Sequence, residues 1–275
     1  MRLLMPRLSI IIVTYNSRAD IEACLASVTG DAAPRVDHEI VVVDNASTDE
    51  TAGFVRERWP GVRVIDAGRN LGFAGANNVG IRQTFGELVL LLNPDARVEA
   101  SAIDRLVALL DTHAGIAVVG PRLEDAGGRA ELSFGPMLSP LTELGQKVLV
   151  AGNDRGWAAV TAIIERLTRH AREVDWVSGA CLLVRRADLE AVGLLDERFF
   201  MYTEDVDVCA SIRARGRTVC FEPAARVVHL RGRSRRSAVS ATEAAYRRSQ
   251  LAFYEKHHPR WVPVLRAYLK MRGRI

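Results

Sequence analysis

Continuous apolar runs alternate with amphipathic segments over the first part of the chain. The apolar runs are rich in β-branched residues and predict buried strands over residues 8–15, 39–47, 62–68 and 87–93. Between them, apolar positions recur at a helical spacing and predict helices over residues 20–28, 47–59 and 72–85. Such alternation predicts an α/β fold with a Rossmann-like, mostly parallel central sheet and helices on both faces.

The rest of the chain continues this pattern with one interruption. Helix and strand character returns over residues 100–123, 175–216 and 217–232. Residues 136–173 show helical spacing instead, and we expect a helical insertion there. The chain therefore predicts a main domain over residues 1–233 and a basic helical C-terminal tail over residues 234–275.

Polar residues stand at the ends of the predicted strands. Thr14 and Tyr15 end the first strand, Asp44 ends the second, and Asn93 and Asp95 follow the fourth. Ligands of such α/β sheets bind beyond the carboxyl ends of the strands. A single acid there is more often a helix cap or a turn residue, but several acids at one edge favour a ligand site.

Asp95 and His229 are candidate metal ligands. Asp95 ends a buried strand, and His229 closes a late one. Carboxylate oxygens with one imidazole suit Mg²⁺ or Mn²⁺, and Mg²⁺ commonly binds one or two carboxylates together with substrate phosphates. We therefore expect a divalent cation whose other ligands are a diphosphate. The alternative for His229 is a structural hydrogen-bonding role.

Composition narrows the class of protein. With 275 residues, 48% of them hydrophobic, the chain can form one substantial core. Four cysteines without a C-x-x-C pair fit reduced thiols in a cytoplasmic protein. The apolar run at residues 8–13 is too short to span a bilayer. The glycine motifs of dinucleotide, P-loop and hydrolase sites are missing.

Positive charge is concentrated near the C-terminal end. From Arg226 onward there are 13 Lys and Arg against two acids, within an overall net charge of +4, so the remainder is acidic. Such a tail suits an anionic partner, namely a membrane, a phosphorylated lipid or nucleic acid. Large apolar residues such as Trp261 favour a helix at an anionic membrane surface. The alternative is a tail that packs its apolar face on the body.

Six motifs resemble, in content and order, those of family 2 glycosyltransferases, and the likeness is to bacterial rhamnosyltransferase-like members. The resemblance extends from Leu8 to Arg233 and implies the GT-A fold for the main domain. The motifs are "IIIVTYNS", "VVVDNASTD", "GRNLGFAGANNVG", "LLLNPDARV", "WVSGACLLVRR" and "FFMYTEDVDVCASIRARG".

The resemblance implies which residues bind the nucleotide. Thr14 and Tyr15 match the strand end that meets the base and ribose, and Asp44 matches the acid that hydrogen-bonds the uracil or thymine ring. Arg69 and Asn70 resemble the loop that approaches the nucleotide.

The same resemblance assigns the metal site. Asn93-Pro94-Asp95 stands in for the D-x-D motif of the family, so Asn93 is a neutral substitute for its first acid. Asp95 is then the main carboxylate on the cation, and His229 matches a histidine that completes the metal site or contacts the diphosphate.

The pair Glu204-Asp205 resembles the "ED" motif that carries the catalytic base. We expect Asp205 to take the proton from the acceptor hydroxyl, with Asp207 as its rival. One base without a carboxylate nucleophile implies direct displacement with inversion. The alternative is an acid-rich helix N-terminus. Trp176, Gly179 and Tyr202 are expected on the acceptor side, where Trp176 can stack on a sugar ring.

Together these features predict an inverting, metal-dependent glycosyltransferase. The expected donor is a nucleotide-diphosphate sugar, such as dTDP-L-rhamnose, and the acceptor is a glycan or a polyprenyl-linked intermediate at the inner face of the cytoplasmic membrane. A nucleotidyltransferase is one alternative, although "VTYNSRAD" lacks the glycine-rich loop expected after the first strand. A nucleic-acid-binding protein is another, but few aromatics interleave the tail's charges and the body is acidic. We expect no nucleic-acid partner.

Overall fold

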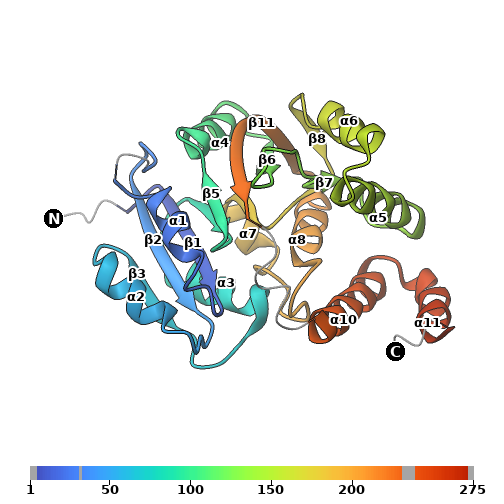
Figure 1. Cartoon of the computed structure of the whole chain (residues 1–275), viewed down its shortest axis with the longest axis horizontal. Coiled ribbons are helices and arrows are strands. Elements are labelled where there is room, and N and C mark those ends of the chain that lie inside the picture. The colour runs from blue at the N-terminus through green and yellow to red at the C-terminus, as the bar shows by residue number, and fades with distance from the viewer. Residues whose placement is uncertain (1–4, 31–32, 231–238, 272–275) are drawn as a thin grey trace.

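A mixed β-sheet runs through the middle of the molecule in the computed structural model (Figure 1). The model describes residues 5–30, 33–230 and 239–271, and nine strands within these ranges form the sheet. Their order is β3-β2-β1-β4-β10-β6-β11-β5, and β8 pairs with β11 beside this path. The strands are β1 (Leu8–Thr14), β2 (His38–Asp44), β3 (Arg63–Asp66), β4 (Leu88–Leu92), β5 (Ala96–Val98), β6 (Ile116–Glu124), β8 (Arg172–Val174), β10 (Cys181–Arg185) and β11 (Thr218–His229).

The direction of the strands is mixed. β1 pairs in parallel with β2 and β4, β2 with β3, and β6 with β11. In contrast, β10 runs antiparallel between β4 and β6, and β5 and β8 run antiparallel to β11. The predicted α/β fold is confirmed. The reversal of β10 was not predicted, because a short strand buried on both faces reads as the same apolar run in either direction.

Alternate residues of β1 face two separate cores, one on each side of the sheet. Ile10 and Ile12 belong to the core that is covered by α1, α2 and α4. Ile11 and Val13 belong to the core that is covered by α3, α7 and α8. These helices are α1 (Ile21–Ala26), α2 (Thr51–Arg58), α3 (Gly72–Arg82), α4 (Ala102–Thr112), α7 (Arg186–Ala191) and α8 (Glu204–Arg213).

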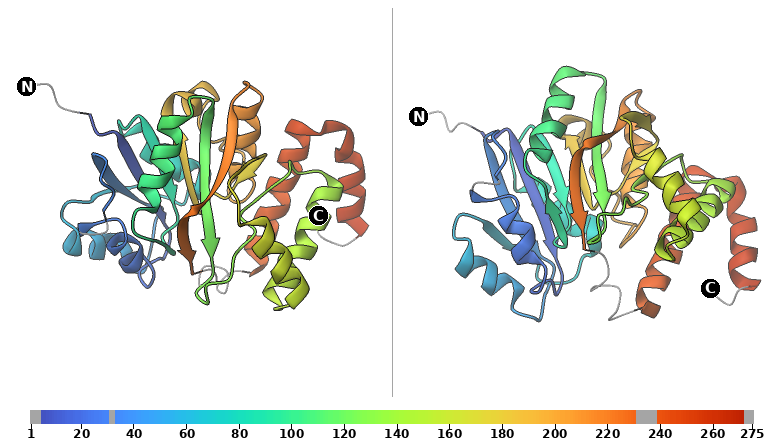
Figure 2. Two further views of the ribbon diagram at one scale, coloured as in Figure 1. Left: turned by 90° about the horizontal axis from the view of Figure 1, so that it is seen from above. Right: turned by 45° about the horizontal axis from the view of Figure 1, so that its top comes forward.

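The predicted insertion at residues 136–173 is a pair of helices, α5 (Pro140–Asp154) and α6 (Ala158–Leu167), followed by β8. A capping box starts α5, in which Ser139 and Thr142 exchange hydrogen bonds between side chain and backbone. Just before α5, β7 (Phe134–Gly135) pairs with β9 (Trp176–Val177) in a separate small sheet. Figure 2 shows α5 and α6 at the end of the molecule opposite β1, β2 and β3, together with the C-terminal helices.

The long C-terminal helix α10 (Val239–His257) packs into the body. Phe253 and Tyr254 are buried in the same core as α3 and α8. A short 3₁₀ turn (Pro259–Trp261) then leads to α11 (Val262–Met271). The expected separate basic tail is therefore not confirmed for α10, and its predicted start after residue 233 lies outside the described residues. Among the described residues, every helix is too short or too polar to cross a membrane.

Candidate active site

The neighbouring ends of β1 and β2 hold a fixed carboxylate. Thr14 lies in register with Asp44, and its hydroxyl donates to Asp44 Oδ1 over 3.1 Å. The other oxygen of Asp44 accepts from the Ser47 backbone N–H at 3.1 Å, and the residue is buried. Tyr15 follows directly and is 49% exposed. A positioned acid and an accessible aromatic ring thus lie together at the carboxyl edge of the sheet.

Asn45 ties the predicted nucleotide loop to the end of β2. Its Nδ2 donates to Asn70 Oδ1 over 3.0 Å and to the Gly72 carbonyl over 3.2 Å, and its Oδ1 accepts from the Leu71 N–H at 2.7 Å. Arg69, in the same loop, is exposed. Asn45 was missed as a functional residue in the sequence. An amide at that position can satisfy both donors and acceptors of a following loop, and this is the signal that could have identified it.

The predicted nucleotide loop, which contains Arg69 and Asn70, also contacts residues 196–203, the segment before α8. Gly72 has φ +75°, and a Cβ atom there would lie 2.2 Å from the Phe200 carbonyl oxygen, so only glycine fits. The next residue, Phe73, donates its N–H to the same carbonyl at 2.7 Å. The loop after β3 and the segment before α8, which are far apart in the sequence, are therefore in direct contact.

Asp95 and His229 lie side by side, as the sequence predicts. The antiparallel pairing of β5 with β11 brings them together, and Asp95 Oδ1 is 3.3 Å from His229 Nε2. On its other side, His229 Nδ1 is 3.4 Å from Glu131 Oε2. Burial lowers the pKa of His229, but the hydrogen bonds to Asp95 and Glu131 raise it more, to about 9. Glu131 was missed, because "RAELSF" carries no motif or periodic signal.

These donors fit a cation that is shared with a substrate. In the part of the chain that the structure describes, no three His, Cys, Asp or Glu residues are grouped to hold a metal. Asp95 and His229 would therefore supply two ligands, and the remainder must come from phosphate and water, as is common for Mg²⁺. The backbone of Asn93 is fixed through its N–H, which donates to the Ala180 carbonyl at 2.9 Å. A surface pocket beside His229 is lined by Asp20, Asp125, Ala126, Gly127, Arg129 and Leu230.

Asp205 points its carboxylate at the predicted acceptor motif. Its Oδ2 accepts from the Gly179 backbone N–H at 2.8 Å, and its Oδ1 accepts from the Val206 N–H at 2.8 Å. A Cβ atom at Gly179 would lie 3.3 Å from Asp205 Cβ and 3.4 Å from the Phe73 ring. Burial raises the pKa of Asp205, although the residue keeps part of its surface exposed.

The two neighbouring acids have different surroundings. Glu204 is buried, and its Oε2 has no hydrogen-bond partner among the described residues. Burial, with repulsion from Asp205 and Asp207, raises its pKa well above the ordinary value. Asp207 is 2% exposed, and its two oxygens lie 2.6 Å from His257 Nε2 and 2.8 Å from Lys256 Nζ.

The turn before α8 is strained. Tyr202 and Thr203 both have positive φ, at 71° and 67°, in the left-handed region that non-glycine residues rarely adopt. The Tyr202 ring meets the Tyr246 ring edge-on, with centroids 5.8 Å apart. Phe200 and Met201, in the same segment, expose 39% and 36% of their surface.

Trp176 does not offer its ring to solvent. It is 7% exposed, its Nε1–H donates to the Pro136 carbonyl at 3.0 Å, and its ring lies against Gly135. The expected stacking of a sugar on this ring is therefore not supported by its position. In the segment before α8, the exposed ring is that of Phe200, and the Tyr202 ring is partly exposed.

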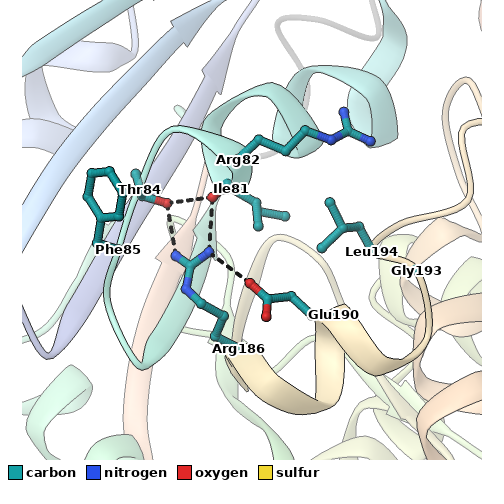
Figure 3. A pocket seen from close by; sticks show the side chains of 8 residues that line it. All are labelled: Ile81, Arg82, Thr84, Phe85, Arg186, Glu190, Gly193 and Leu194. Carbon is teal, nitrogen blue, oxygen red and sulfur yellow. Dashed lines mark hydrogen bonds and ion pairs between the residues drawn. The ribbon is translucent and has the colours of Figure 1, made fainter.

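A second pocket lies at the opposite edge of the sheet (Figure 3). The Arg186 side chain lines this pocket and donates to the Ile81 carbonyl and to the Thr84 hydroxyl, each at 3.0 Å. Glu190 lies 3.7 Å from the guanidinium. Because Arg186 satisfies carbonyl groups at the end of α3, we interpret this pocket as part of the framework.

Acids and polar residues gather at the carboxyl ends of β1, β2, β4 and β11, at one edge of an α/β sheet, where such folds bind their ligands. The model of the family described as "Glycosyltransferase like family 2" matches residues 6–263, and the chain belongs to this family. The protein is a glycosyltransferase.

Curated relatives support this assignment. The chain is 32% identical to the N-acetylglucosaminyl-diphospho-decaprenol L-rhamnosyltransferase of Mycobacterium tuberculosis, over 92% of this chain and 86% of the relative. It is 30% identical to the low-salt glycan biosynthesis hexosyltransferase Agl10 of Haloferax volcanii, over 75% of this chain and 61% of that protein.

Solved structures share the fold. A mannosyltransferase from Pyrobaculum calidifontis, in complex with GDP-Man and Mn²⁺, superposes with a TM-score of 0.62 at 21% identity, over 97% of this chain and 70% of that one. GalNAc-T7 with UDP, GalNAc and Mn²⁺ gives a TM-score of 0.62 at 18% identity, over 90% and 48%. The predicted GT-A fold is thereby confirmed.

Proposed function

We propose that the protein is an inverting, metal-dependent glycosyltransferase that moves L-rhamnose from dTDP-rhamnose to a hydroxyl of a lipid-linked glycan. One observation carries the chemistry: Asp205 has no ion-pair partner among the described residues, and Gly179, which donates its N–H to Asp205, lies against both Asp205 and the Phe73 ring. The name of the M. tuberculosis relative gives the sugar and suggests a polyprenyl-diphosphate-linked acceptor. The enzyme would then act in glycan or cell-wall biosynthesis at the inner face of the cytoplasmic membrane.

The donor nucleotide would bind along the ends of β1 and β2. The Asp44 carboxylate, fixed by Thr14, would accept the ring N–H of a thymine or uracil base, and the exposed Tyr15 ring would lie against base or ribose. Asn70 is held by Asn45, and the exposed Arg69 would approach the phosphates.

Asp95 and His229 would hold the divalent cation, Mg²⁺ or Mn²⁺, at the donor diphosphate. When bound, this ion neutralises charge that develops on the departing diphosphate. Asn93 contributes an amide where the family motif has an acid, so the protein supplies one charge fewer than a D-x-D site. Arg129, held by Asp125 at 2.8 Å in the adjacent pocket, is placed to contact the same anion.

Asp205 would act as the general base. As the acceptor oxygen forms its bond to the anomeric carbon, the bond from that carbon to the diphosphate breaks and the hydroxyl proton passes to Asp205. Asp207 suits this role less well, since Lys256 and His257 contact its two oxygens. Glu204 suits it less well too, because burial favours its protonated form.

The acceptor would enter beside the segment before α8. Gly179 lets Asp205 and the Phe73 ring approach closely, since a Cβ atom there would lie 3.3 and 3.4 Å from them, while Tyr202 and the exposed Phe200 would offer rings on which a sugar can pack. Trp176 would support this side from below rather than contact the sugar.

An anionic membrane would bind α11. Leu269 turns inward and is buried, whereas Trp261, Val264 and Tyr268 are 48%, 57% and 47% exposed. Basic residues flank this outer face: Arg260, Arg266 and Lys270. Apolar residues bordered by positive charge match a leaflet of anionic lipids. Of the two C-terminal helices, α11 suits this role better, because the Phe253 and Tyr254 side chains of α10 are buried in the core.

Co-sedimentation with vesicles tests the membrane contact. We expect full-length protein to bind vesicles of anionic lipid at low salt and to be released by high salt, whereas a chain that ends at His258 stays in the supernatant. This end point keeps α10 intact. Equal sedimentation of both chains would contradict the role of α11, and binding to duplex DNA instead would favour a nucleic-acid partner.

Thermal-shift screening tests the donor. We expect dTDP-rhamnose to raise Tm more than UDP or GDP sugars, and only with Mn²⁺ or Mg²⁺ present. A ligand at 100 times its Kd adds about 2.7 kcal/mol of stability, which such a screen detects. Release of pyrophosphate from a nucleoside triphosphate and a sugar phosphate would support a nucleotidyltransferase instead.

A further inference from the structure

We propose that Lys256, together with His257, is a positioning residue that holds the catalytic helix α8 through Asp207. This inference rests on the proposed role of Asp205 as the base. It assigns to the end of α10 a part in sugar transfer, because α10 fixes the geometry of the segment that carries the base.

The contact at Asp207 is buried, and its carboxylate has two basic partners. Its carboxylate is 2% exposed and lies 2.8 Å from Lys256 Nζ and 2.6 Å from His257 Nε2. A buried carboxylate is strongly unfavourable unless it is paired. Asp207 lies in the first turn of α8, where its N–H donates to the Thr203 carbonyl at 2.8 Å. The end of α10 therefore fixes the same turn that carries Asp205.

Lys256 contacts both ends of the segment before α8. Besides Asp207, its Nζ lies 2.9 Å from Asp196 Oδ2, and Asp196 in turn is held by Arg198. These hydrogen bonds, led by the one from Arg198, lower the pKa of Asp196, so its charge persists over the working pH range. The Lys256 ammonium group thus links Asp196 to Asp207 and holds the two ends of the stretch between them.

Helix α10 also holds the strained middle of this loop. Ser249 Oγ donates to the Met201 carbonyl at 2.8 Å, next to the left-handed residues Tyr202 and Thr203. Left-handed backbone persists only where the surroundings impose it. Without Lys256, we expect the loop to relax and Asp205 to leave its position against Gly179. A displacement of about 1 Å at a reacting group can cost on the order of 100-fold in rate.

The helix has a second anchor that does not involve Lys256. Tyr246, Gln250 and Tyr254 all donate to the buried Glu143 of α5, and the Gln250 contact is 2.5 Å long. Loss of Lys256 alone should therefore leave α10 docked and the protein folded. This separates a positioning role from a general loss of stability.

Steady-state kinetics of matched variants tests the proposal in the full-length protein with Mn²⁺, dTDP-rhamnose and a lipid-linked acceptor. We expect Lys256→Gln to lower Tm, because the buried Asp207 loses one partner, but to stay folded at the assay temperature with donor KM close to wild type and kcat lower by about 10- to 100-fold. We expect Lys256→Arg to restore most of the rate. The matched control is Glu255→Gln, at the residue next to Lys256 on α10. It breaks an exposed 2.7 Å pair with Arg266 of α11 and should leave kcat, KM and Tm unchanged.

A double-mutant cycle locates the effect. If Lys256 acts through Asp207, the losses in Asp207→Asn and Lys256→Gln will not add, and the double variant will resemble the worse single variant. Additive losses would place the role of Lys256 elsewhere and overturn the proposal. So would a Lys256→Gln variant with the kcat of the Glu255→Gln control, or one whose loss of rate merely follows its folded fraction.

Amide hydrogen exchange over residues 196–207 gives a readout that does not need activity. Lys256→Gln should exchange faster there than wild type and Glu255→Gln, and unchanged exchange would overturn the proposal. A wild-type protein that transfers no sugar would instead contradict the proposed function, and the exchange data would still decide whether Lys256 holds the loop.

Discussion

Asp205, Glu204 and Asp207 share one helical turn, yet each has different surroundings. Asp205 accepts only backbone hydrogen bonds, Glu204 is buried with an unpartnered oxygen among the described residues, and Asp207 is paired with Lys256 and His257. A sequence with three acids in four positions cannot distinguish them, because their surroundings come from β9, Gly179 and α10, which are distant in the chain.

Asp205→Asn should abolish transfer and spare donor binding. The amide keeps the shape but cannot take a proton, so we expect kcat to fall by about 10²–10⁴-fold with an unchanged nucleotide thermal shift. In wild type, the base must be ionised. Because burial raises its pKa, kcat should decline with falling pH at a pH above the ordinary aspartate value of about 3.9. Near-normal transfer in Asp205→Asn, with loss in Asp207→Asn instead, would move the role to Asp207.

Glu204→Gln should stabilise the protein at neutral pH. The raised pKa of Glu204 means that the folded state binds its proton more tightly than the unfolded chain. Stability therefore falls as pH rises from the unfolded value, about 4.3, towards the folded one. Glutamine removes this dependence, so Tm should exceed that of wild type at pH 7 and match it near pH 4. The test is to measure Tm of both proteins between pH 4 and pH 7. If the difference in Tm between Glu204→Gln and wild type does not change with pH, Glu204 stays ionised in the folded protein.

Asp95→Ala should remove metal-dependent nucleotide binding and leave the fold intact. Asp95 lies at the sheet edge, partly exposed, and contributes little to the core. We expect dTDP to raise the Tm of this variant equally with and without Mn²⁺. Wild-type metal dependence in the variant would show that Asp95 is only a turn residue.

Residue positions were predictable where a motif names them. Asp44, Asp95, His229 and Asp205 all lie at the predicted edge of the sheet. Glu131 and the inward turn of Trp176 were not predictable, since the first depends on a hairpin without a motif and the second on a hydrogen bond to Pro136.

At the scale of elements, the buried Glu143 of α5 is the anchor for α10. Burial raises its pKa, but Lys147, Tyr246 and Gln250 lower it more, so the net shift is downward. Glu143 therefore stabilises the fold above its unfolded pKa, and this contribution is lost as pH falls through the lower, folded pKa.

Glu143→Ala should destabilise the protein markedly. The change leaves the donors of Tyr246, Gln250 and Tyr254 without an acceptor, and one such unpaired buried group costs about 1–3 kcal/mol. We expect a loss of about 3 kcal/mol in the free energy of unfolding at pH 7, measured by urea denaturation, and a smaller loss for Glu143→Gln. A change within 0.5 kcal/mol, roughly the size for an exposed pair, would show that α10 is not anchored there.

Periodicity predicted most of the elements and failed on their partners. The apolar runs place β1 to β4 and β11 within a few residues, because burial on both faces leaves a clear signal. The docking of α10 was not predictable. Its buried Phe253 and Tyr254 lie among Arg and Lys residues in the sequence. The acids that α10 contacts, Glu143 through Tyr254 and Asp196 and Asp207 through Lys256, are remote in sequence.

For the whole molecule, the excess of positive charge in the C-terminal region has two explanations, one structural and one functional. Some cations of the C-terminal region, such as Lys256, neutralise acids of the body. Among the described cations around α11, Arg266 pairs with the exposed Glu255, and the proposed role of Arg260, Arg266 and Lys270 is to contact the membrane. The GT-A body and its C-terminal helices would then form one unit, with the site at the edge of the sheet and a lipid-facing helix at its end.

The most direct test of the proposed chemistry is to follow the anomeric configuration during sugar transfer. Purified protein with Mn²⁺, dTDP-rhamnose and a polyprenyl-diphosphate-linked GlcNAc acceptor should give a product heavier by one rhamnose residue. Its new linkage, read by NMR, should be inverted relative to the donor, and Asp205→Asn should form it about 10²–10⁴-fold more slowly. A product with retained configuration, or no transfer from any of a panel of nucleotide sugars, would contradict the assignment of Asp205 as the base of an inverting glycosyltransferase.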